Sequence, residues 1–537
     1  MLTRSRPHAP ALLAAPLLSL LAALVPRSAP AGDGDPRLVP ALDALLAGEG
    51  VRAARVGVSV WHLGPGGRRL YGARAEVPLH PASNTKIVTT AAALELLGPA
   101  YVHHTDLAVD KLEGGVSGEL YLIGGGDPRF VGESLWSLVE DARLAGLKTV
   151  KGDLIVDESF FGPEHEAPGY ADKDQDTAYR APSGATTLNW NAVTVKLKPG
   201  RLGEAPVVEL YPDGDYAEIV NTASTTKGDK ERLTVVATGV DAPGGSRRTR
   251  LAIGGTIGAS SRGATVRKRI DDPALFTGHA ARKWLGRAGI TVKGKVRVGA
   301  APGKRRRLGR VESRPMAMLA ADVNKFSNNI MAEHLMRTLG REKGGAGDWN
   351  AGREVVSTWL RKSVGIDGFT YRNGSGLFGD TAFSADHLVA ILRHVHGRRP
   401  ALPEFAASLA IGGVDGTLRK RLRDLPRGAV RAKTGTLDGV ICLAGYVTLK
   451  DGSEAAFAFL TNDVRGAPWR IWKAQDDLVR VLAGFDPGSV EVVPVREAPK
   501  ASPAAPTDRG KKGNKGKNGK EGKKKRSRPP ADEDSPP

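Results

Sequence analysis

The chain has 537 residues, of which 41% are hydrophobic, and it carries a formal net charge of +20 at pH 7. This length allows more than one domain, and the composition up to about residue 500 is that of a globular protein and excludes a fibrous or wholly disordered chain. A single cysteine, Cys442, excludes an intramolecular disulfide, and its apolar neighbours predict a buried strand residue.

The first residues have the pattern of a secretory signal. Arg4 and Arg6 precede an apolar run over residues 11–25, and small residues follow at 29–31. The apolar run is shorter than the about 20 residues that a membrane-spanning helix needs. We therefore predict a signal peptide over residues 1–31 and an exported protein that works in the periplasm or elsewhere outside the cytoplasm.

The first candidate motif follows a predicted strand over residues 56–63. A helix is predicted over residues 83–97, and it begins with the string Ser83-Asn84-Thr85-Lys86. Residues three apart on a helix share one face, so the side chains of Ser83 and Lys86 are expected to be neighbours. Backbone N–H groups are free in the first turn of a helix, where the helix dipole favours an anion. A nucleophile at this place would lie close to ready-made hydrogen-bond donors.

The next two hundred residues are rich in short strands. The predicted strands are separated by Gly, Pro and Asp and lie at residues 106–110, 119–123, 154–157, 193–197, 207–210 and 233–236. A glycine cluster at 124–126 lacks the Gly-Lys-Ser/Thr ending of a phosphate-binding loop, so it is expected to be a turn. We predict a β-rich inserted region over residues 106–300, composed of two lobes.

Helical patterning returns after this region and then gives way to strands. Helices are predicted over residues 316–325 and 330–339, with Ser327-Asn328-Asn329 at the turn between them. A strand over residues 430–436 contains Lys433-Thr434-Gly435, and a hairpin and a closing helix follow it. Strands from both ends of the body are expected to share one sheet, with the helices packed against it.

The C-terminal segment has a different composition. Residues 500–537 hold 12 Lys/Arg and 5 Asp/Glu, a net charge of +7, with almost no apolar residues. We predict a disordered basic tail over residues 498–537. Such a tail suits an anionic wall polymer or a membrane surface, and the alternative is a solvated tail without a partner. No specific nucleic-acid partner is expected.

The three short strings form one set. S-x-x-K, S-x-N and K-T-G in this order are the motifs of penicillin-binding proteins and class A β-lactamases. Alone, the first string would indicate a helix cap and a surface lysine, but the full set predicts an enzyme that forms an ester on its serine. No group of His, Cys or carboxylates has metal-ligand spacing, so neither a metal nor a cofactor is expected. No G-x-S-x-G string surrounds Ser83, which argues against a Ser-His-Asp hydrolase.

Several flanking strings extend the pattern: Tyr179-Arg180-Ala181-Pro182, Leu188-Asn189-Trp190-Asn191 and Gly413-Val414-Asp415-Gly416-Thr417-Leu418. With the motifs, they resemble the D-alanyl-D-alanine carboxypeptidase/endopeptidase family of class C low-molecular-mass penicillin-binding proteins, over about residues 35–483. The roughly 240 residues between the first two motifs correspond to the family's two extra domains, which β-lactamases lack.

The resemblance implies an α/β (α+β) fold of the penicillin-recognising transpeptidase type. In this fold a five-stranded antiparallel sheet has helices on both faces. We assign residues 32–105 and 301–497 to this catalytic domain, interrupted by the β-rich insertion over residues 106–300.

The residue types predict a mechanism. Ser83 would be the nucleophile and Lys86 its base, with the pKa of Lys86 lowered by the like charge of Lys433. Ser327 would relay a proton to the leaving amine, and Asn329 would hold either Lys86 or the substrate amide.

The resemblance adds further roles. It implies an oxyanion hole formed by the backbone N–H groups of Ser83 and Thr436, and carboxylate binding by Lys433 and Thr434, next to Gly435. It also implies recognition of the stem peptide's side chain by Asp174 and Tyr179. The family's arginine after Gly-Ser-Gly-Leu is absent here, since Phe378-Gly379-Asp380 occupies that place.

We therefore expect an exported serine-type D-Ala-D-Ala carboxypeptidase, D,D-endopeptidase or both. Its substrates would be peptidoglycan stem peptides that end in D-Ala-D-Ala, or D,D-cross-links, and β-lactams would inhibit it. A secreted β-lactamase is one alternative, and the long insertion argues against it. A non-catalytic wall-binding protein is another, and the intact serine, lysine and K-T-G motif argue against that.

Overall fold

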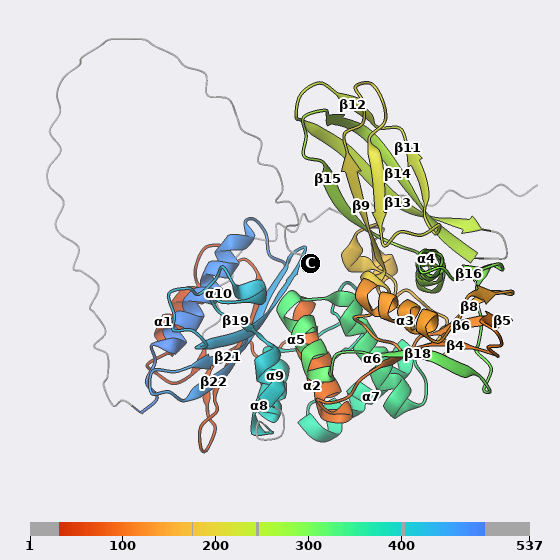
Figure 1. The fold of residues 1–537 in the computed structure, drawn as a ribbon. Helices are drawn as coiled ribbons and strands as arrows, with labels where there is room; N and C mark the ends of the chain where they lie inside the picture. The colour runs from red at the N-terminus through yellow and green to blue at the C-terminus, as the bar shows by residue number, and fades with distance from the viewer. Residues whose placement is uncertain (1–31, 174, 243–245, 399–402, 489–537) are drawn as a thin grey trace, which may run out of the picture.

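The computed structural model describes residues 32–173, 175–242, 246–398 and 403–488 (Figure 1). The predicted signal peptide, the predicted basic tail and Asp174 lie outside the described residues. Among the residues described, no helix has both the length and the apolar character needed to cross a membrane.

The catalytic sheet contains strands from both ends of the chain. Its five long strands are all antiparallel and lie in the order β3 (Arg69–Ala73), β2 (Arg55–His62), β22 (Glu454–Asn462), β21 (Val440–Thr448) and β20 (Val430–Leu437). Two-residue strands extend the edges, β1 (Asp33–Gly34) beside β3 and β19 (Ala410–Ile411) beside β20. The predicted five-stranded antiparallel sheet is confirmed. Cys442 is buried in β21, also as predicted.

Helices cover both faces of this sheet. Helices α1 (Val39–Leu46) and α10 (Pro468–Ala483) pack on one face, and α8 (Ala385–Gly397) packs on the other (Figure 1). Side chains alternate along a strand. Phe457 and Phe459 of β22 accordingly join the core beneath α10, whereas Ala458 and Leu460 join the core beneath α8. Alternate side chains of each strand therefore pack against the helices on opposite faces of the sheet.

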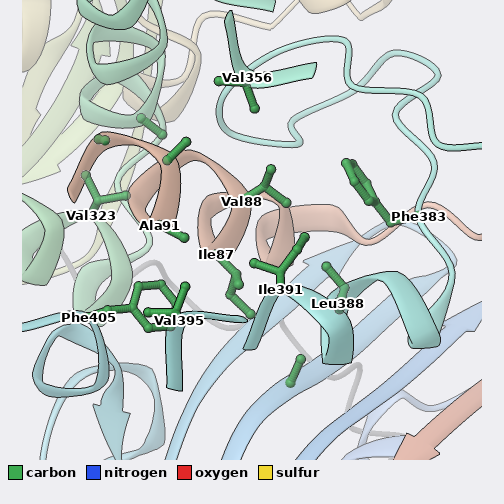
Figure 2. Packing of buried hydrophobic residues seen from close by; sticks show 14 of the residues in the cluster. Ile87, Val88, Ala91, Val323, Val356, Phe383, Leu388, Ile391, Val395 and Phe405 are labelled. Atoms are coloured by element: carbon green, nitrogen blue, oxygen red, sulfur yellow. The ribbon is translucent and has the colours of Figure 1, made fainter. Parts of the chain in front are cut away.

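Helix α2 (Thr85–Leu97) lies in the middle of the second core. Every residue from Thr85 to Leu94 is buried, so this helix is enclosed on all sides. The neighbouring helices are α5 (Met316–Phe326), α6 (Asn329–Gly344), α7 (Trp349–Trp359), α8 and α9 (Pro403–Ser408). Figure 2 shows side chains of α2 packed among those of its neighbours: Ile87, Val88 and Ala91 with Val323, Leu388, Ile391, Val395 and Phe405. This packing fixes the position of the helix that carries Lys86.

Two further helices complete the helical layer. Helix α6 (Asn329–Gly344) follows α5 after a short turn, and α7 (Trp349–Trp359) packs along α6 and continues into a π-helical turn over Leu360–Val364.

The insertion between α2 and α5 begins with a group of α/β elements. A five-stranded mixed sheet has the order β17 (Val296–Val298), β8 (Leu154–Asp157), β6 (Leu120–Ile123), β4 (His104–Val109) and β18 (Arg306–Glu312). A small parallel sheet joins β16 (Thr291–Val292), β7 (Thr149–Val150) and β5 (Val116–Ser117), beside helices α3 (Gly132–Leu144) and α4 (Pro273–Arg287). Because β4 pairs with β18, the chain enters and leaves the insertion through neighbouring strands.

The second group in the insertion consists of strands alone. One sheet contains β10 (Val207–Tyr211), β9 (Ala192–Lys198) and β15 (Ala264–Arg269). The other contains β11 (Glu218–Asn221), β12 (Ser224–Thr226), β13 (Glu231–Ala242) and β14 (Ser246–Gly258). Figure 1 shows these strands projecting away from the catalytic sheet. Strands thus predominate over helices in the described part of the insertion.

Candidate active site

Ser83 lies in a short turn before α2 and not in the helix itself. The sequence predicted an α-helix from residue 83, but residues Ala82–Asn84 form a 3-10 turn and the α-helix begins at Thr85. Ala82 has a φ of 48°, a left-handed conformation that is rare for alanine. The side chain of Lys86 is fully buried, whereas Ser83 is only partly buried and can meet a substrate.

Two glycines from distant parts of the sequence, Gly376 and Gly435, lie against the backbone of this turn. A Cβ atom at Gly376 would lie 2.1 Å from the carbonyl oxygen of Ala82, and one at Gly435 would lie 2.7 Å from that of Pro81. Only glycine permits such close approach of backbone to backbone. The glycine of the K-T-G motif therefore brings β20 against the turn that carries Ser83.

Lys86 has three polar neighbours that together suit a base. Its Nζ atom lies 2.9 Å from Ser83 Oγ, 2.7 Å from Asn329 Oδ1 and 2.9 Å from the carbonyl oxygen of Ser375. The amide and peptide oxygens can only accept hydrogen bonds, whereas the serine hydroxyl can also donate. A neutral amine has two hydrogens and one lone pair, so its hydrogens fit the two carbonyl oxygens and its lone pair is left for the hydroxyl of Ser83.

Burial sets the protonation state of Lys86. It lowers the pKa of this amine to about 7, while the charge of Glu333 acts in the opposite direction. Burial is the main cause, where the sequence analysis named only the like charge of Lys433; that charge acts in the same direction, because the repulsion between two amines is mutual. The pKa of Lys433 is itself well below its usual value, because of burial and then of the charge of Lys86. Two buried amines therefore lie in one site with lowered proton affinity.

The S-x-N motif occupies the turn between α5 and α6, as predicted. Ser327 ends α5 with a φ of 58°, and the side chain of Asn328 accepts the N–H of Met331 (3.1 Å) and caps α6. Ser327 Oγ accepts a hydrogen bond from Lys433 Nζ (2.8 Å). The side-chain oxygen of Asn329 accepts from Lys86, and its nitrogen donates to the carbonyl of Tyr179 (2.9 Å). Of the two contacts expected for Asn329, the structure shows the one with Lys86.

The K-T-G motif lies in the middle of β20. Lys433 Nζ donates to the carbonyl of Thr434 (2.7 Å) as well as to Ser327, and Thr434 Oγ1 donates to Thr417 Oγ1 (2.8 Å). Thr417 belongs to the short turn Gly416–Leu418, which lies beside β20. One amine and two hydroxyls thus gather at a single edge of the sheet.

The N–H of Thr436 points out of that same edge. In the β20–β21 ladder, Thr448 N donates to Ala429 O (2.7 Å). Opposed residues of an antiparallel pair alternate between bonded and non-bonded pairs, so the odd-numbered residues of β20 bond to β21. The backbone groups of Thr434 and Thr436 then face the other way, which agrees with the contact from Lys433 to Thr434 O. This orientation leaves the Thr436 N–H available to a ligand.

Of the two residues expected to recognise a stem side chain, only Tyr179 is described. Its carbonyl oxygen contacts Asn329, while the residue is 44% exposed and its hydroxyl donates to Gln175 (2.6 Å). The structure therefore brings the other eight described site residues of the prediction together with the backbone of Tyr179.

Sequence reasoning missed Glu333 and the carbonyl of Ser375. Glu333 follows Asn329 by four residues on α6, so an acidic residue at that spacing in an apolar stretch was the available signal. Nothing in the sequence around Ser375 indicated that its carbonyl would reach Lys86. Within the described part of the chain, no group of three or more His, Cys, Asp or Glu side chains could hold a metal ion.

Comparison with known proteins gives a consistent result. The model of the D-Ala-D-Ala carboxypeptidase 3 (S13) family matches residues 38–482. The chain belongs to this family. It is 33% identical over 464 residues to a D-alanyl-D-alanine carboxypeptidase of Actinomadura sp. (strain R39), a match that covers 83% of this chain and 84% of that protein. The chain is therefore a serine-type peptidase of the D-Ala-D-Ala carboxypeptidase class, as the motifs predicted.

Solved structures agree on the fold. The S13 peptidase is similar to penicillin binding protein 4 (dacB) from Haemophilus influenzae, with a TM-score of 0.71, 21% identity and coverage of 83% of this chain and 99% of that one. A structure of that protein complexed with a β-lactam gives a TM-score of 0.67 at the same identity and coverage. The penicillin-recognising fold is confirmed.

Proposed function

We propose that this S13 peptidase cleaves D-Ala-D-Ala peptides of peptidoglycan through an ester on Ser83, with Lys86 as the general base. The observation that carries the proposal is the environment of Lys86 Nζ, which has two fixed acceptors and the hydroxyl of Ser83 within 2.9 Å. A pKa of about 7 keeps a useful fraction of this amine neutral at physiological pH.

The acylation step then uses groups that are already in contact. Neutral Lys86 takes the proton of Ser83 as Oγ attacks the carbonyl carbon of the penultimate D-Ala. The negative oxygen of the tetrahedral intermediate would be held by the N–H groups of Ser83 and Thr436, and such donors are worth about 3 kcal/mol each. Cleavage of the C–N bond releases D-Ala, whose amine receives a proton by way of Ser327. Water then hydrolyses the ester and restores the serine.

Lys433 and Thr434 would bind the terminal carboxylate, because they form a cationic and hydroxyl edge beside Ser327. A bound carboxylate raises the pKa of a neighbouring amine, so Lys433 would be protonated in the complex. A D,D-cross-link presents the same peptide bond and carboxylate with a larger leaving amine, so endopeptidase activity needs no additional chemical group. A β-lactam presents a carboxylate beside a strained amide, and we expect it to acylate the same serine.

The N-terminal signal supports export, and action outside the cytoplasm agrees with a cell-wall substrate. The net charge of +7 over residues 500–537 supports attachment of the tail to an anionic wall polymer.

Fluorescent penicillin tests the assignment of the nucleophile. The wild-type enzyme should be labelled on the peptide that contains Ser83, and Ser83→Ala should not be labelled. Ser261→Ala is a matched control, because Ser261 lies on an exposed hydrogen bond in the insertion and should leave labelling unchanged. Labelling of Ser83→Ala at the wild-type level contradicts the proposal. Digestion of purified peptidoglycan, with products identified by mass, then separates loss of terminal D-Ala from cleavage of cross-links.

A further inference from the structure

A buried carboxylate lies one helical turn beyond Asn329. Glu333 is on the same face of α6 as Asn329 and is only 1% exposed. None of the acyl-transfer steps above uses it. Burying a carboxylate costs several kcal/mol unless hydrogen bonds compensate, so its partners indicate what it does.

The partners of Glu333 come from three separate segments. Oε2 accepts from Trp349 Nε1 (2.9 Å) on α7 and from the N–H of Gly374 (3.0 Å), and Oε1 accepts from the N–H of Ser375 (2.9 Å). The hydroxyl of Tyr170 lies 3.5 Å from Oε1. These donors are all neutral, and two are consecutive backbone N–H groups of one loop.

That loop supplies an acceptor to Lys86. The N–H of Ser375 donates to Glu333, while the carbonyl of the same residue accepts from Lys86 Nζ at 2.9 Å. The loop also lies directly on α6, because a Cβ atom at Gly374 would be 2.4 Å from the carbonyl oxygen of Ala332. A single residue, Ser375, thus connects the carboxylate to the amine.

We propose that Glu333 is a positioning residue for the general base: it holds the Gly374–Ser375 peptide so that the carbonyl of Ser375 keeps the amine of Lys86 against Ser83. This inference rests on the proposed role of Lys86. Asn329 supplies the second acceptor for Lys86. Two side chains of α6 therefore act on this amine, Asn329 by direct contact and Glu333 through the loop that it holds.

The charge of Glu333 gives the arrangement a measurable consequence. Its negative charge raises the pKa of Lys86 and so offsets part of the effect of burial. The charged and titratable groups that face Glu333 and Lys86 from the surrounding elements are Lys433 of β20, Arg337 of α6, Tyr170 and Tyr371. The acylation rate should fall at low pH as Lys86 becomes protonated, and we call this part of the pH profile the acid limb. Neutralising Glu333 should lower the pKa of Lys86 and therefore move the acid limb to lower pH.

The test is the pH dependence of acylation by fluorescent penicillin at saturating ligand. For Glu333→Gln we expect the acid limb to move down by up to about one pH unit, with a plateau rate reduced about tenfold or more because the loop is no longer fixed. Glu342→Gln removes the same charge from an exposed place near the end of α6, and it should leave both limb and plateau unchanged. A Glu333→Gln limb at the wild-type pH overturns the inference.

Thermal unfolding shows whether the Glu333→Gln variant is folded, and only a folded variant can be used in the test. Should Glu333→Gln fail to fold, the decision passes to Glu333→Asp, which keeps the charge on a shorter side chain. A folded Glu333→Asp enzyme with a plateau rate at least tenfold below wild type supports the positioning role, and a wild-type rate overturns it. A wild-type enzyme without any acid limb, or without label on Ser83, would instead refute the proposed role of Lys86 and this inference with it.

Discussion

Gly435 lies against the carbonyl oxygen of Pro81, so the third residue of K-T-G contacts the turn that carries the nucleophile. An added Cβ atom would be 2.7 Å from that oxygen and 3.2 Å from the Cβ of Ala82. The contact joins the backbone of β20 to the backbone of the turn at Pro81, and both are packed in the protein. Neither can move away without displacing Ser83.

Gly435→Ala should therefore impair both stability and acylation. Overpacking of this kind costs about 1–3 kcal/mol, and a displacement of Ser83 by about 1 Å would slow acylation about 100-fold. Thermal unfolding and the rate of labelling by fluorescent penicillin measure the two effects. Gly286→Ala is the control, because Gly286 lies in α4 with open space around it and should be neutral or slightly stabilising. Wild-type acylation in Gly435→Ala would show that the contact is not needed.

The acid limb of acylation should have its midpoint near pH 7. The neutral form of Lys86 is the active one, and burial lowers its pKa to about 7, so the rate should fall as the pH drops below that value. The measurement is the single-turnover acylation rate between pH 5 and pH 9 at saturating ligand, which excludes effects on binding. A rate that stays constant down to pH 5 would show that Lys86 is not the titrating base.

Asn329→Asp should move the same limb in the opposite direction. Asn329 Oδ1 lies 2.7 Å from Lys86 Nζ, and a carboxylate at that place favours the protonated amine. Opposite charges at such distances shift a pKa by about 1–3 units, so the limb should rise from about 7 to about 8 or higher.

Asn328→Asp provides the matched control for this shift. It introduces the same charge one residue earlier, at the cap of α6, where aspartate is as good a cap as asparagine. The limb should move much less than in Asn329→Asp. Equal shifts in the two variants would mean that the contact with Lys86 does not matter.

Features that depend on local sequence could be predicted, whereas features that depend on contacts between residues distant in sequence could not. The predicted strand over 430–436 and the predicted helix over 330–339 depend on local patterns. The structure contains both within one or two residues of those bounds, except that α6 continues to Gly344. The 3-10 turn at Ser83 depends on Gly376 and Gly435, which are distant in sequence.

The same reason explains the errors at the site. The lowered pKa of Lys86 was attributed to a like charge alone, but its main cause is the burial of α2 among α5, α6, α7, α8 and α9, which no local pattern reveals. Glu333 contacts Gly374 and Ser375 across about forty residues of chain. The motifs identified side chains that meet at one site, whereas tertiary packing determines how those side chains are held.

Lys433→Ala should reduce discrimination for a free carboxyl terminus. A hydrogen bond to a charged group is worth about 1.5–3 kcal/mol, so the preference for a D-Ala-D-Ala peptide acid over its C-terminal amide should fall about tenfold or more. The ratio of kcat/KM for the two peptides is the measurement, because a general slowing from loss of the Ser327 contact affects both equally. An unchanged ratio would place the carboxylate elsewhere.

The basic tail should govern attachment and leave the chemistry unchanged. Residues 500–537 carry a net charge of +7 and lie outside every motif. An enzyme truncated after Pro499 should hydrolyse a soluble dipeptide substrate at the full-length rate but sediment less with isolated cell-wall material at low salt. The difference should disappear near 1 M salt, where charges interact over only about 3 Å. A full-length chain with the tail's Lys and Arg changed to Gln is the control for tail length, and it should behave as the truncated form does. Equal sedimentation of all three forms at low salt would mean that the tail is a solvated segment without a partner, and loss of dipeptide hydrolysis on truncation would contradict the predicted domain boundary.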